Sequence, residues 1–289
     1  MTKEKELLSI VESQVSTNDI IIASKYINLN YNIFATDSQL WDIIQMAFGS
    51  HNLQELFWGY QQKLLANRFI NILLLKYYLC ERTVKYAIVN SLKNRPDTVL
   101  FEMPVLGSRI DVCRINGNSY AYEIKTELDT FKRLPKQIIN YSNVFEYVYI
   151  TVSKDTYESI LPLIPDYCGI CFFAQTIKKD DMKLWTKRKA TKSPNINPYS
   201  QLQCFSSETL AILLKNRKIK KIPSSKEDRI QYILDNYSAK TINSDFKKIV
   251  KLIYKDNWEF IKKHYNEILP IDLQAFFNSN LDPNLLYFK

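Results

Sequence analysis

The stretch R-I-D-V-C-R-I (109–115), N-G-N (116–118) and S-Y-A-Y-E-I-K (119–125) decides the fold. Its two flanks largely alternate apolar and polar residues, which predicts β-strands, and N-G-N is a turn signal. A three-residue loop at 116–118 pairs the strands so that Asp111 lies opposite Glu123. A two-residue Asn-Gly turn would put these acids on opposite faces, so their cooperation requires an odd loop or a bulge.

Strand geometry also predicts which side chains share a face. Residues two apart in a strand point the same way, so Glu123 and Lys125 point together while Tyr122 and Ile124 point away. Two carboxylates opposite one another repel by about 0.2–1 kcal/mol, and on a half-buried face such a pair requires a cation. The alternative is a surface hairpin with ordinary charge pairing.

The expected cation is Mg²⁺, or Mn²⁺ in its place, because Mg²⁺ takes hard oxygen ligands. Asp111 and Glu123 are its predicted ligands, and the carbonyl of Ile124 adds another oxygen. Lys125 then orients or helps to deprotonate a water, or neutralises charge that develops on a phosphate. The pattern D-x(11)-E-x-K therefore predicts the catalytic centre of a metal-dependent phosphodiesterase.

The sequence on either side of this hairpin predicts an α/β fold. Helical and strand patterns follow one another in the order αβββαβαβ, which predicts helices packed on a mixed sheet. The expected helices are 81–94, 133–145 and 155–164, and L-D-T-F (128–131) is expected to open the second of them. The expected strands are 99–105, 109–115, 119–125, 146–153 and 167–174. The expected domain organisation is a helical N-terminal region (1–79), an α/β core (80–175), a basic linker (176–200) and a helical, lysine-rich C-terminal region (201–289).

The charge of the chain favours an anionic partner. The formal net charge is +9, which points to nucleic acid first and to a membrane surface second. No apolar run is long enough to span a bilayer, and the charged N-terminus does not resemble a secretion signal. The five scattered cysteines fit a reducing compartment. We therefore expect a cytoplasmic protein with no membrane segment.

Several classes of chemistry are disfavoured by composition. The chain has only two histidines, far apart in sequence, and five glycines. Histidine-based catalysis and glycine-rich phosphate loops are therefore not expected. Cys168 and Cys171 form a lone C-x-x-C, which is more typical of buried thiols than of a zinc site because a zinc site needs further ligands.

Residues 80–175 resemble the PD-(D/E)xK, or restriction-endonuclease-like, nuclease superfamily. The acid on one strand and E-I-K on the next match its core motif, although no proline directly precedes Asp111. The run from Glu123 to Tyr141 is similar to an uncharacterised bacterial branch of that superfamily. The resemblance implies a restriction-endonuclease-like core and catalysis by Asp111, Glu123 and Lys125.

The resemblance implies roles for further residues. Glu81 matches an acid on the first core helix that joins the metal site, although a glutamate favoured by the helix dipole is an equal alternative. Gln137 and Tyr141 form a Q-x-x-x-Y similar to the catalytic helix motif of helicase–nuclease repair enzymes, and they share one helical face. A polar edge of an amphipathic helix is the alternative. Three neighbouring cations are expected to contact phosphates: Lys132, Arg133 and Lys136.

The leading hypothesis is a Mg²⁺-dependent nuclease that acts on nucleic acid, with DNA as the expected substrate. The alternative is a nucleic-acid-binding or regulatory protein that keeps this fold without cleavage. A helical scaffold protein with an incidental α/β insert is a third class, but it leaves the motif at 111–125 without a purpose.

Overall fold

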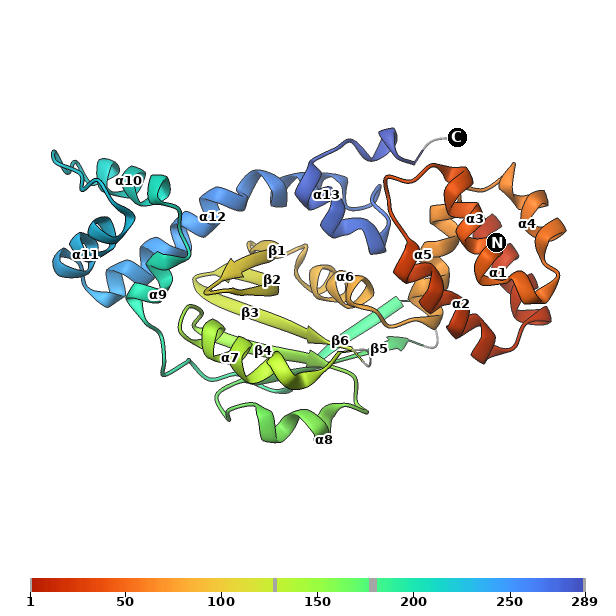
Figure 1. Cartoon of the computed structure of the whole chain (residues 1–289), viewed down its shortest axis with the longest axis horizontal. Coiled ribbons are helices and arrows are strands. Elements are labelled where there is room, and N and C mark those ends of the chain that lie inside the picture. Colours follow the sequence, from red (N-terminus) through yellow and green to blue (C-terminus); the bar gives the residue numbers. More distant parts are fainter. Residues whose placement is uncertain (1, 127–128, 177–180, 288–289) are drawn as a thin grey trace. The chain divides into compact units, whose positions relative to one another are not determined.

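The structure is a computed structural model that describes residues 2–126, 129–176 and 181–287. It is an α/β protein with a six-stranded sheet and helical N- and C-terminal regions (Figure 1). The predicted fold class, a mixed sheet flanked by helices, is therefore confirmed. The chain forms two compact units, which are described separately below. Unit 1 comprises Met1–Ser91, Phe173–Leu184 and Glu259–Lys289, and unit 2 comprises Leu92–Phe172 and Trp185–Trp258.

The sheet has the strand order β1-β2-β3-β4-β5-β6. The first three strands are antiparallel neighbours, and β3, β4 and β5 are parallel neighbours. Parallel neighbours need crossover connections, and helices supply them. The strands are β1 (Thr98–Val105), β2 (Ser108–Asn116), β3 (Asn118–Lys125), β4 (Tyr147–Val152), β5 (Gly169–Thr176) and β6 (Asp181–Arg188).

The register of the β2–β3 hairpin is the one predicted from the sequence. Asn116 pairs with Asn118 and Val112 pairs with Tyr122. Gly117 lies at the tip with φ +66°, a conformation that glycine adopts without steric cost. Continued by one residue, this register sets Asp111 across from Glu123.

Helices α10 (Ser207–Asn216) and α11 (Lys226–Asn236) of unit 2 begin at serine caps. Ser206 and Ser225 each accept a backbone N–H in the first turn of α10 and α11, which satisfies a donor that the helix leaves free. Between β3 and β4, α7 packs on β2 and β4. The helical elements are η2 (Phe131–Arg133), α7 (Leu134–Ser142), α8 (Tyr157–Ile160), η3 (Leu161–Leu163), α9 (Pro198–Gln203), α10 (Ser207–Asn216), α11 (Lys226–Asn236) and α12 (Ala239–His264), which continues into unit 1.

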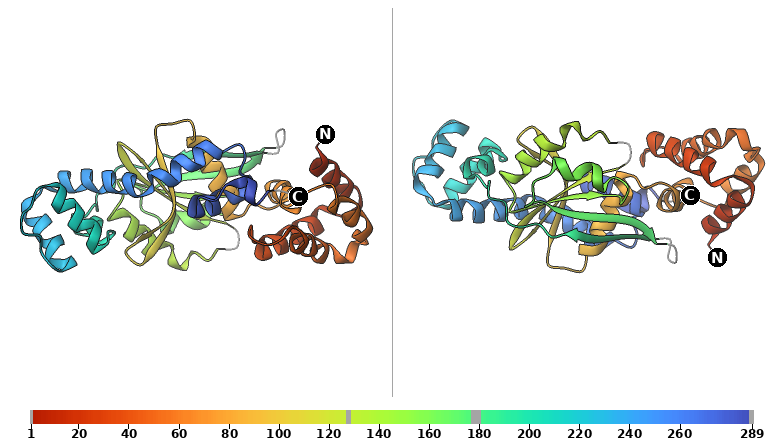
Figure 2. Two further views of the ribbon diagram at one scale, coloured as in Figure 1. Left: turned by 90° about the horizontal axis from the view of Figure 1, so that it is seen from above. Right: turned by 90° about the horizontal axis from the view of Figure 1, so that it is seen from below.

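The unit 2 part of α12 is joined to the sheet region by polar contacts. The indole of Trp258 donates to the carbonyl of Asp97 at 2.6 Å, and Lys247 lies 3.0 Å from the buried carboxylate of Glu146. Figure 2 shows this helix passing over the strands when they are seen from above. At least one lysine of α12, Lys247, therefore forms a structural ion pair.

Unit 1 is mostly helical, and its core contains an aromatic cluster. Trp41 is fully buried and packs against Phe57 and Phe69 at ring-centroid distances of 6.2 and 6.4 Å. Its helical elements are α1 (Lys3–Gln14), α2 (Thr17–Asn30), α3 (Asp37–Ala47), η1 (Gly49–His51), α4 (Gln54–Gln61), α5 (Ala66–Tyr77), α6 (Glu81–Leu92), η4 (Pro270–Asp272), α13 (Leu273–Ser279) and η5 (Pro283–Leu285).

Part of the segment expected to be a basic linker is a strand. Residues 176–200 were predicted to connect two domains, but β6 occupies 181–188 and pairs within the sheet. The polar residues of β6 alternate with Met182 and Leu184, so a strand pattern is present among the charges. Leu128, where a helix was expected to open, and residues 177–180 lie outside the described residues. No helix in the described part of the chain is both long and apolar enough to cross a bilayer.

Candidate functional site

A buried acid, Glu123 of β3, stands at the centre of the candidate site. Its side chain is only 2% exposed. One carboxylate oxygen lies 2.7 Å from Lys125 Nζ, and the other lies 2.9 Å from the Tyr141 hydroxyl. Glu123 and Lys125 therefore share a face of β3, as strand alternation predicted.

The charge of Glu123 is balanced by its neighbours. Burial raises the pKa of this carboxyl, and the charge of Lys125 is the main effect that lowers it again. Hydrogen bonds from Lys125, Tyr141 and Gln137 act in the same direction as that charge. A buried ion pair is stable only when further hydrogen bonds satisfy its partners. Tyr141 supplies such a bond from α7.

Asp111 is fixed by the backbone of the neighbouring strand. Its Oδ2 accepts the N–H of Ile124 at 2.6 Å. Regular β2–β3 pairing ends at Val112 and Tyr122. Just beyond that pair, the backbone N–H of Ile124 donates to the Asp111 carboxylate. The half-buried Asp111 is thus held next to the segment that carries Glu123 and Lys125. The carbonyl of Ile124 as a metal ligand stays a prediction.

The structure adds an acid that sequence reasoning missed, Glu102 of β1. One carboxylate oxygen of Glu102 lies within 4.8 Å of one of Asp111. Glu102 has φ +54°, which is unusual for a residue other than glycine. Its neighbours Phe101 and Met103 pair with Val112 and Ile110, so the irregular backbone falls opposite Asp111. Such strain costs about 1–3 kcal/mol and is concentrated at functional sites.

Helix α7 brings Gln137 and Tyr141 to the same place. The Tyr141 hydroxyl lies 2.7 Å from the carbonyl of Arg109 in addition to its contact with Glu123, and its single proton serves one of the two oxygens. Burial and the charge of Glu123 raise the pKa of Tyr141, so its hydroxyl keeps that proton. Gln137 Nε2 lies 3.5 Å from the hydroxyl, and Gln137 Oε1 is buried without a hydrogen-bond partner among the described residues.

The last turn of α7 is tied to the β1–β2 turn. Asn140 Nδ2 donates to the carbonyl of Leu106 at 3.0 Å and to the hydroxyl of Ser108 at 2.8 Å. Leu106 and Gly107 both have positive φ, which is the backbone of a tight hairpin turn. The two hydrogen bonds of Asn140 therefore hold α7 close to β2, the strand that carries Asp111.

A cationic cavity of about 590 Å³ opens between that turn and α7. Arg109, Arg133 and Lys136 line it, together with Gln137. Arg133 and Lys136 are exposed. The side chain of Arg109 is 67% exposed, and its Nε lies 3.9 Å from a carboxylate oxygen of Glu102. Lys132 is exposed on η2 but does not line the cavity. Two of the three predicted phosphate-contacting cations therefore surround one cavity.

Glu81 belongs to unit 1. It is the first residue of α6, its side chain is 52% exposed, and it forms an ion pair with Lys85 one turn along the helix. A glutamate in the first turn also complements the helix dipole. Its role as a metal ligand stays a prediction.

The comparisons with known proteins identify a family. Residues 76–276, more than half of the 289-residue chain, match the family described as bacteriophage P4 protein cII. The chain belongs to this family. The matched range contains all six strands and every residue of the candidate site.

One solved structure shows a weak similarity to this chain. A solved structure described as SPO1766 protein of unknown function from Silicibacter pomeroyi is 15% identical to this chain, with a TM-score of 0.34. The match covers 47% of this chain and 90% of that one. No curated protein matches the chain.

Proposed function

We propose that this member of the P4 cII family is a metal-dependent nuclease that hydrolyses phosphodiester bonds in DNA. One observation carries the proposal. Asp111 is held by the N–H of Ile124 beside the buried Glu123–Lys125 pair, which is the acid, acid and lysine set of the PD-(D/E)xK pattern. The family description names no activity, so the proposal rests on the site itself.

The donor atoms suit Mg²⁺ or Mn²⁺. Asp111 and Glu102 offer carboxylate oxygens within 4.8 Å of one another, and Glu123 is a third acid on the neighbouring strand. Hard oxygen donors with one or two carboxylates, completed by water and substrate phosphate, are the usual environment of Mg²⁺. A bound metal supplies Lewis-acid stabilisation of the phosphate and a more acidic water.

The protein's own residues prepare the site. Tyr141 orients Glu123, and Asn140 fixes α7 relative to the strand that carries Asp111. Lys125 holds a positive charge in a nearly buried position, where charge acts more strongly than in water. We assign Lys125 to the stabilisation of charge that develops on the scissile phosphate, and Gln137 and Tyr141 to positioning.

Substrate binding is assigned to the cationic cavity. Arg109, Arg133 and Lys136 gather there without an equal number of acids, so a polyanion gains favourable contacts. Lys132 lies in the same segment and extends this surface. The net charge of +9 has the same sign and favours the approach of nucleic acid.

A non-cleaving nucleic-acid-binding or regulatory protein is the second candidate. A specific observation favours it: both oxygens of Glu123 are engaged, one by Lys125 and one by Tyr141. A nuclease that uses Glu123 as a metal ligand has to place the metal at a lone pair of an oxygen that already has one of these contacts. A binding protein has no such requirement.

A cleavage assay distinguishes the two candidates. The full chain is incubated with linear, circular and single-stranded DNA and with RNA, each with Mg²⁺, Mn²⁺ or EDTA. The proposal expects metal-dependent cleavage of at least one DNA form, and loss of that cleavage in EDTA. DNA binding without cleavage of any form would favour the second candidate.

A further inference from the structure

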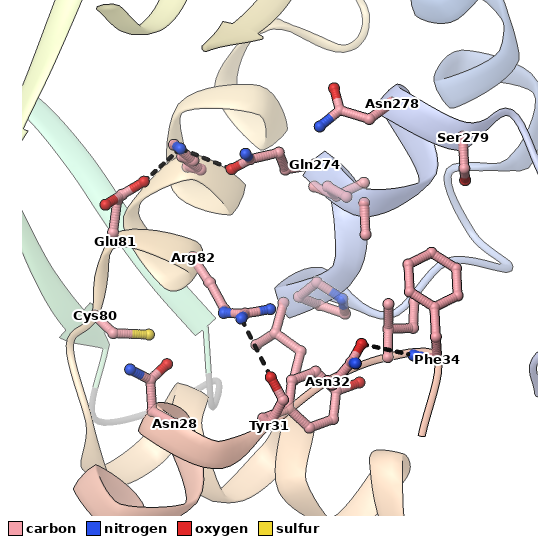
Figure 3. A pocket seen from close by; sticks show the side chains of 16 residues that line it. Asn28, Tyr31, Asn32, Phe34, Cys80, Glu81, Arg82, Gln274, Asn278 and Ser279 are labelled. Atoms are coloured by element: carbon pink, nitrogen blue, oxygen red, sulfur yellow. Dashed lines mark hydrogen bonds and ion pairs between the residues drawn. The ribbon is translucent and has the colours of Figure 1, made fainter. Parts of the chain in front are cut away.

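A cavity within unit 1 is lined by none of the acids of β1–β3. It has a volume of about 690 Å³ and lies between the end of α2, the start of α6, and η4 with α13 (Figure 3). Sites for small organic ligands commonly have volumes of about 300–1,000 Å³. All of its lining residues belong to unit 1.

One side of the cavity offers a cation. The guanidinium of Arg82 lies over the ring of Tyr31, 5.4 Å from its centroid, and Nη2 is 3.4 Å from the Tyr31 carbonyl. Among the residues that the structure describes, no carboxylate pairs with Arg82. The charge of Arg82 lowers the pKa of Asp272, but the carboxylate of Asp272 accepts its hydrogen bonds from the hydroxyls of Tyr31 and Tyr287. A half-buried guanidinium in this situation is suited to a phosphate, which matches its planar set of donors.

The second cation of the cavity is already neutralised. Lys85 is nearly buried, pairs with Glu81 and donates to Gln274 Oε1 at 2.7 Å. The charges of Lys85 and Glu81 therefore offset one another. The cation left for a ligand is Arg82, whose charge also acts on the buried Asp272. A ligand with one phosphate group fits this charge better than a polyphosphate.

The rest of the lining suits a nucleobase. Asn28 Oδ1 is buried and has no hydrogen-bond partner within the described part of the chain, so a ligand that donates a hydrogen bond would relieve the cost of its burial. Asn278 and Ser279 offer further polar groups, and the ring of Phe34 is 56% exposed. In Figure 3, Arg82 comes from one side of the cavity, and Phe34, Asn278 and Ser279 come from the other. Amides recognise base edges, and aromatic rings stack on base faces.

We propose that this cavity binds a nucleoside monophosphate, with the phosphate at Arg82 and the base against Phe34 and the surrounding amides. The proposal does not depend on the nuclease activity, since none of the residues it uses belongs to the sheet. It assigns a small-molecule site to unit 1 of a protein whose proposed catalytic residues, Glu81 apart, lie in unit 2.

Isothermal titration of the full chain tests this site. The probes are adenosine monophosphate, uridine monophosphate, adenosine and inorganic phosphate, all with EDTA present so that cleavage plays no part. At least one monophosphate is expected to bind at least tenfold more tightly than adenosine or phosphate. Arg82→Gln is expected to weaken that binding at least tenfold, whereas Lys25→Gln, an exposed change on α2, leaves it unchanged.

A second variant guards against a folding defect in Arg82→Gln. Phe34→Ala removes an exposed ring, so its fold and melting temperature should match the parent, and nucleotide binding should fall several-fold. Absence of binding by every probe would overturn the proposal. It would also fall if adenosine or phosphate bound as tightly as the nucleotides, or if both variants bound like the parent.

Discussion

The Asp111 carboxylate accepts the backbone N–H of Ile124 at 2.6 Å, and this bond joins β2 to the residue between Glu123 and Lys125. A hydrogen bond to a charged acceptor contributes about 1.5–3 kcal/mol. The same side chain lies within 4.8 Å of Glu102, oxygen to oxygen. Asp111 therefore holds the hairpin together, and the nuclease proposal gives it a second, separable role in binding a cation.

Lys125→Met is expected to separate metal binding from cleavage. The variant removes the cation beside Glu123 and keeps much of the side-chain length, so the carboxylate loses its ion pair and becomes available to a metal. Mg²⁺ affinity at pH 8 should be equal to or higher than that of the parent, whereas cleavage should fall by at least a hundredfold. Metal titration and cleavage are measured on the same preparations, with the exposed Lys220→Met as control. Parent-like cleavage by Lys125→Met would remove the lysine from the catalytic assignment.

The same variant should change how stability depends on pH. Burial already raises the pKa of Glu123, and loss of Lys125 raises it further. A raised folded-state pKa means that the protonated form is favoured in the folded protein, so stability falls as the pH rises from about 4.5 through the folded pKa. The total fall in unfolding free energy should be larger in Lys125→Met than in the parent, as measured by urea unfolding between pH 4 and pH 8. An equal fall in both proteins would contradict the role of Lys125 as the balancing charge.

Tyr141→Phe is expected to act on positioning and not on metal affinity. It removes the hydroxyl shared by Glu123 and the Arg109 carbonyl and costs about 1–2 kcal/mol of stability. Cleavage should fall by about tenfold, while Mg²⁺ affinity changes less than in Asp111→Asn. Gln137→Ala should follow the same pattern with a smaller loss of stability. Metal binding as weak as in the Asp111 variant would show that these residues hold the metal.

Arg133 and Lys136 should contribute to DNA affinity through phosphate contacts alone. Replacing both by Gln removes two cations from the cavity beside Gln137. The slope of log affinity against log salt should become less steep by about 1 for each lost contact, for every DNA sequence tested. The control is the exposed Lys220→Gln. An unchanged salt slope would place the nucleic-acid surface elsewhere.

Asp272 should give unit 1 its own pH dependence. This fully buried acid has a pKa raised from 3.8 to about 6, chiefly by burial, in spite of hydrogen bonds from Tyr287 and Tyr31. At about 1.4 kcal/mol per pKa unit, this rise in pKa corresponds to about 3 kcal/mol of unfolding free energy. Because the folded state favours the neutral acid, stability falls as the pH rises from about 4 to about 6 and then levels off.

Asp272→Asn carries no charge at any pH, so this fall should be absent from the variant. The difference in unfolding free energy between variant and parent is measured at pH 4, 5, 6 and 7. The unfolding free energy of the variant should rise relative to that of the parent as the pH increases from 4 to 7. A difference that does not change with pH would mean that Asp272 is not titrating as burial requires.

The sequence predicted the site as far as local patterns allow. Alternation placed Glu123 and Lys125 on one face, and the odd loop around Gly117 set the register of the hairpin, because both depend only on neighbours in the chain. Glu102 was missed because its place depends on a positive φ and on pairing with β2, neither of which its apolar surroundings in V-L-F-E-M-P-V reveal. Strand β6 was taken for linker because charged residues obscure its alternation.

The most direct test of the nuclease proposal compares the parent with Asp111→Asn and Asp111→Ala in one metal-dependent cleavage assay. Asn keeps an oxygen that accepts the N–H of Ile124, so Asp111→Asn should melt close to the parent, whereas Asp111→Ala loses about 1–3 kcal/mol of stability. Both should lose Mg²⁺ affinity and cleavage, because both lack the charged oxygen that a hard cation prefers. Asp235→Asn, an exposed change on α11, is the control and should cleave like the parent. Cleavage by the folded Asp111→Asn variant at the parent's rate would contradict the proposed active site.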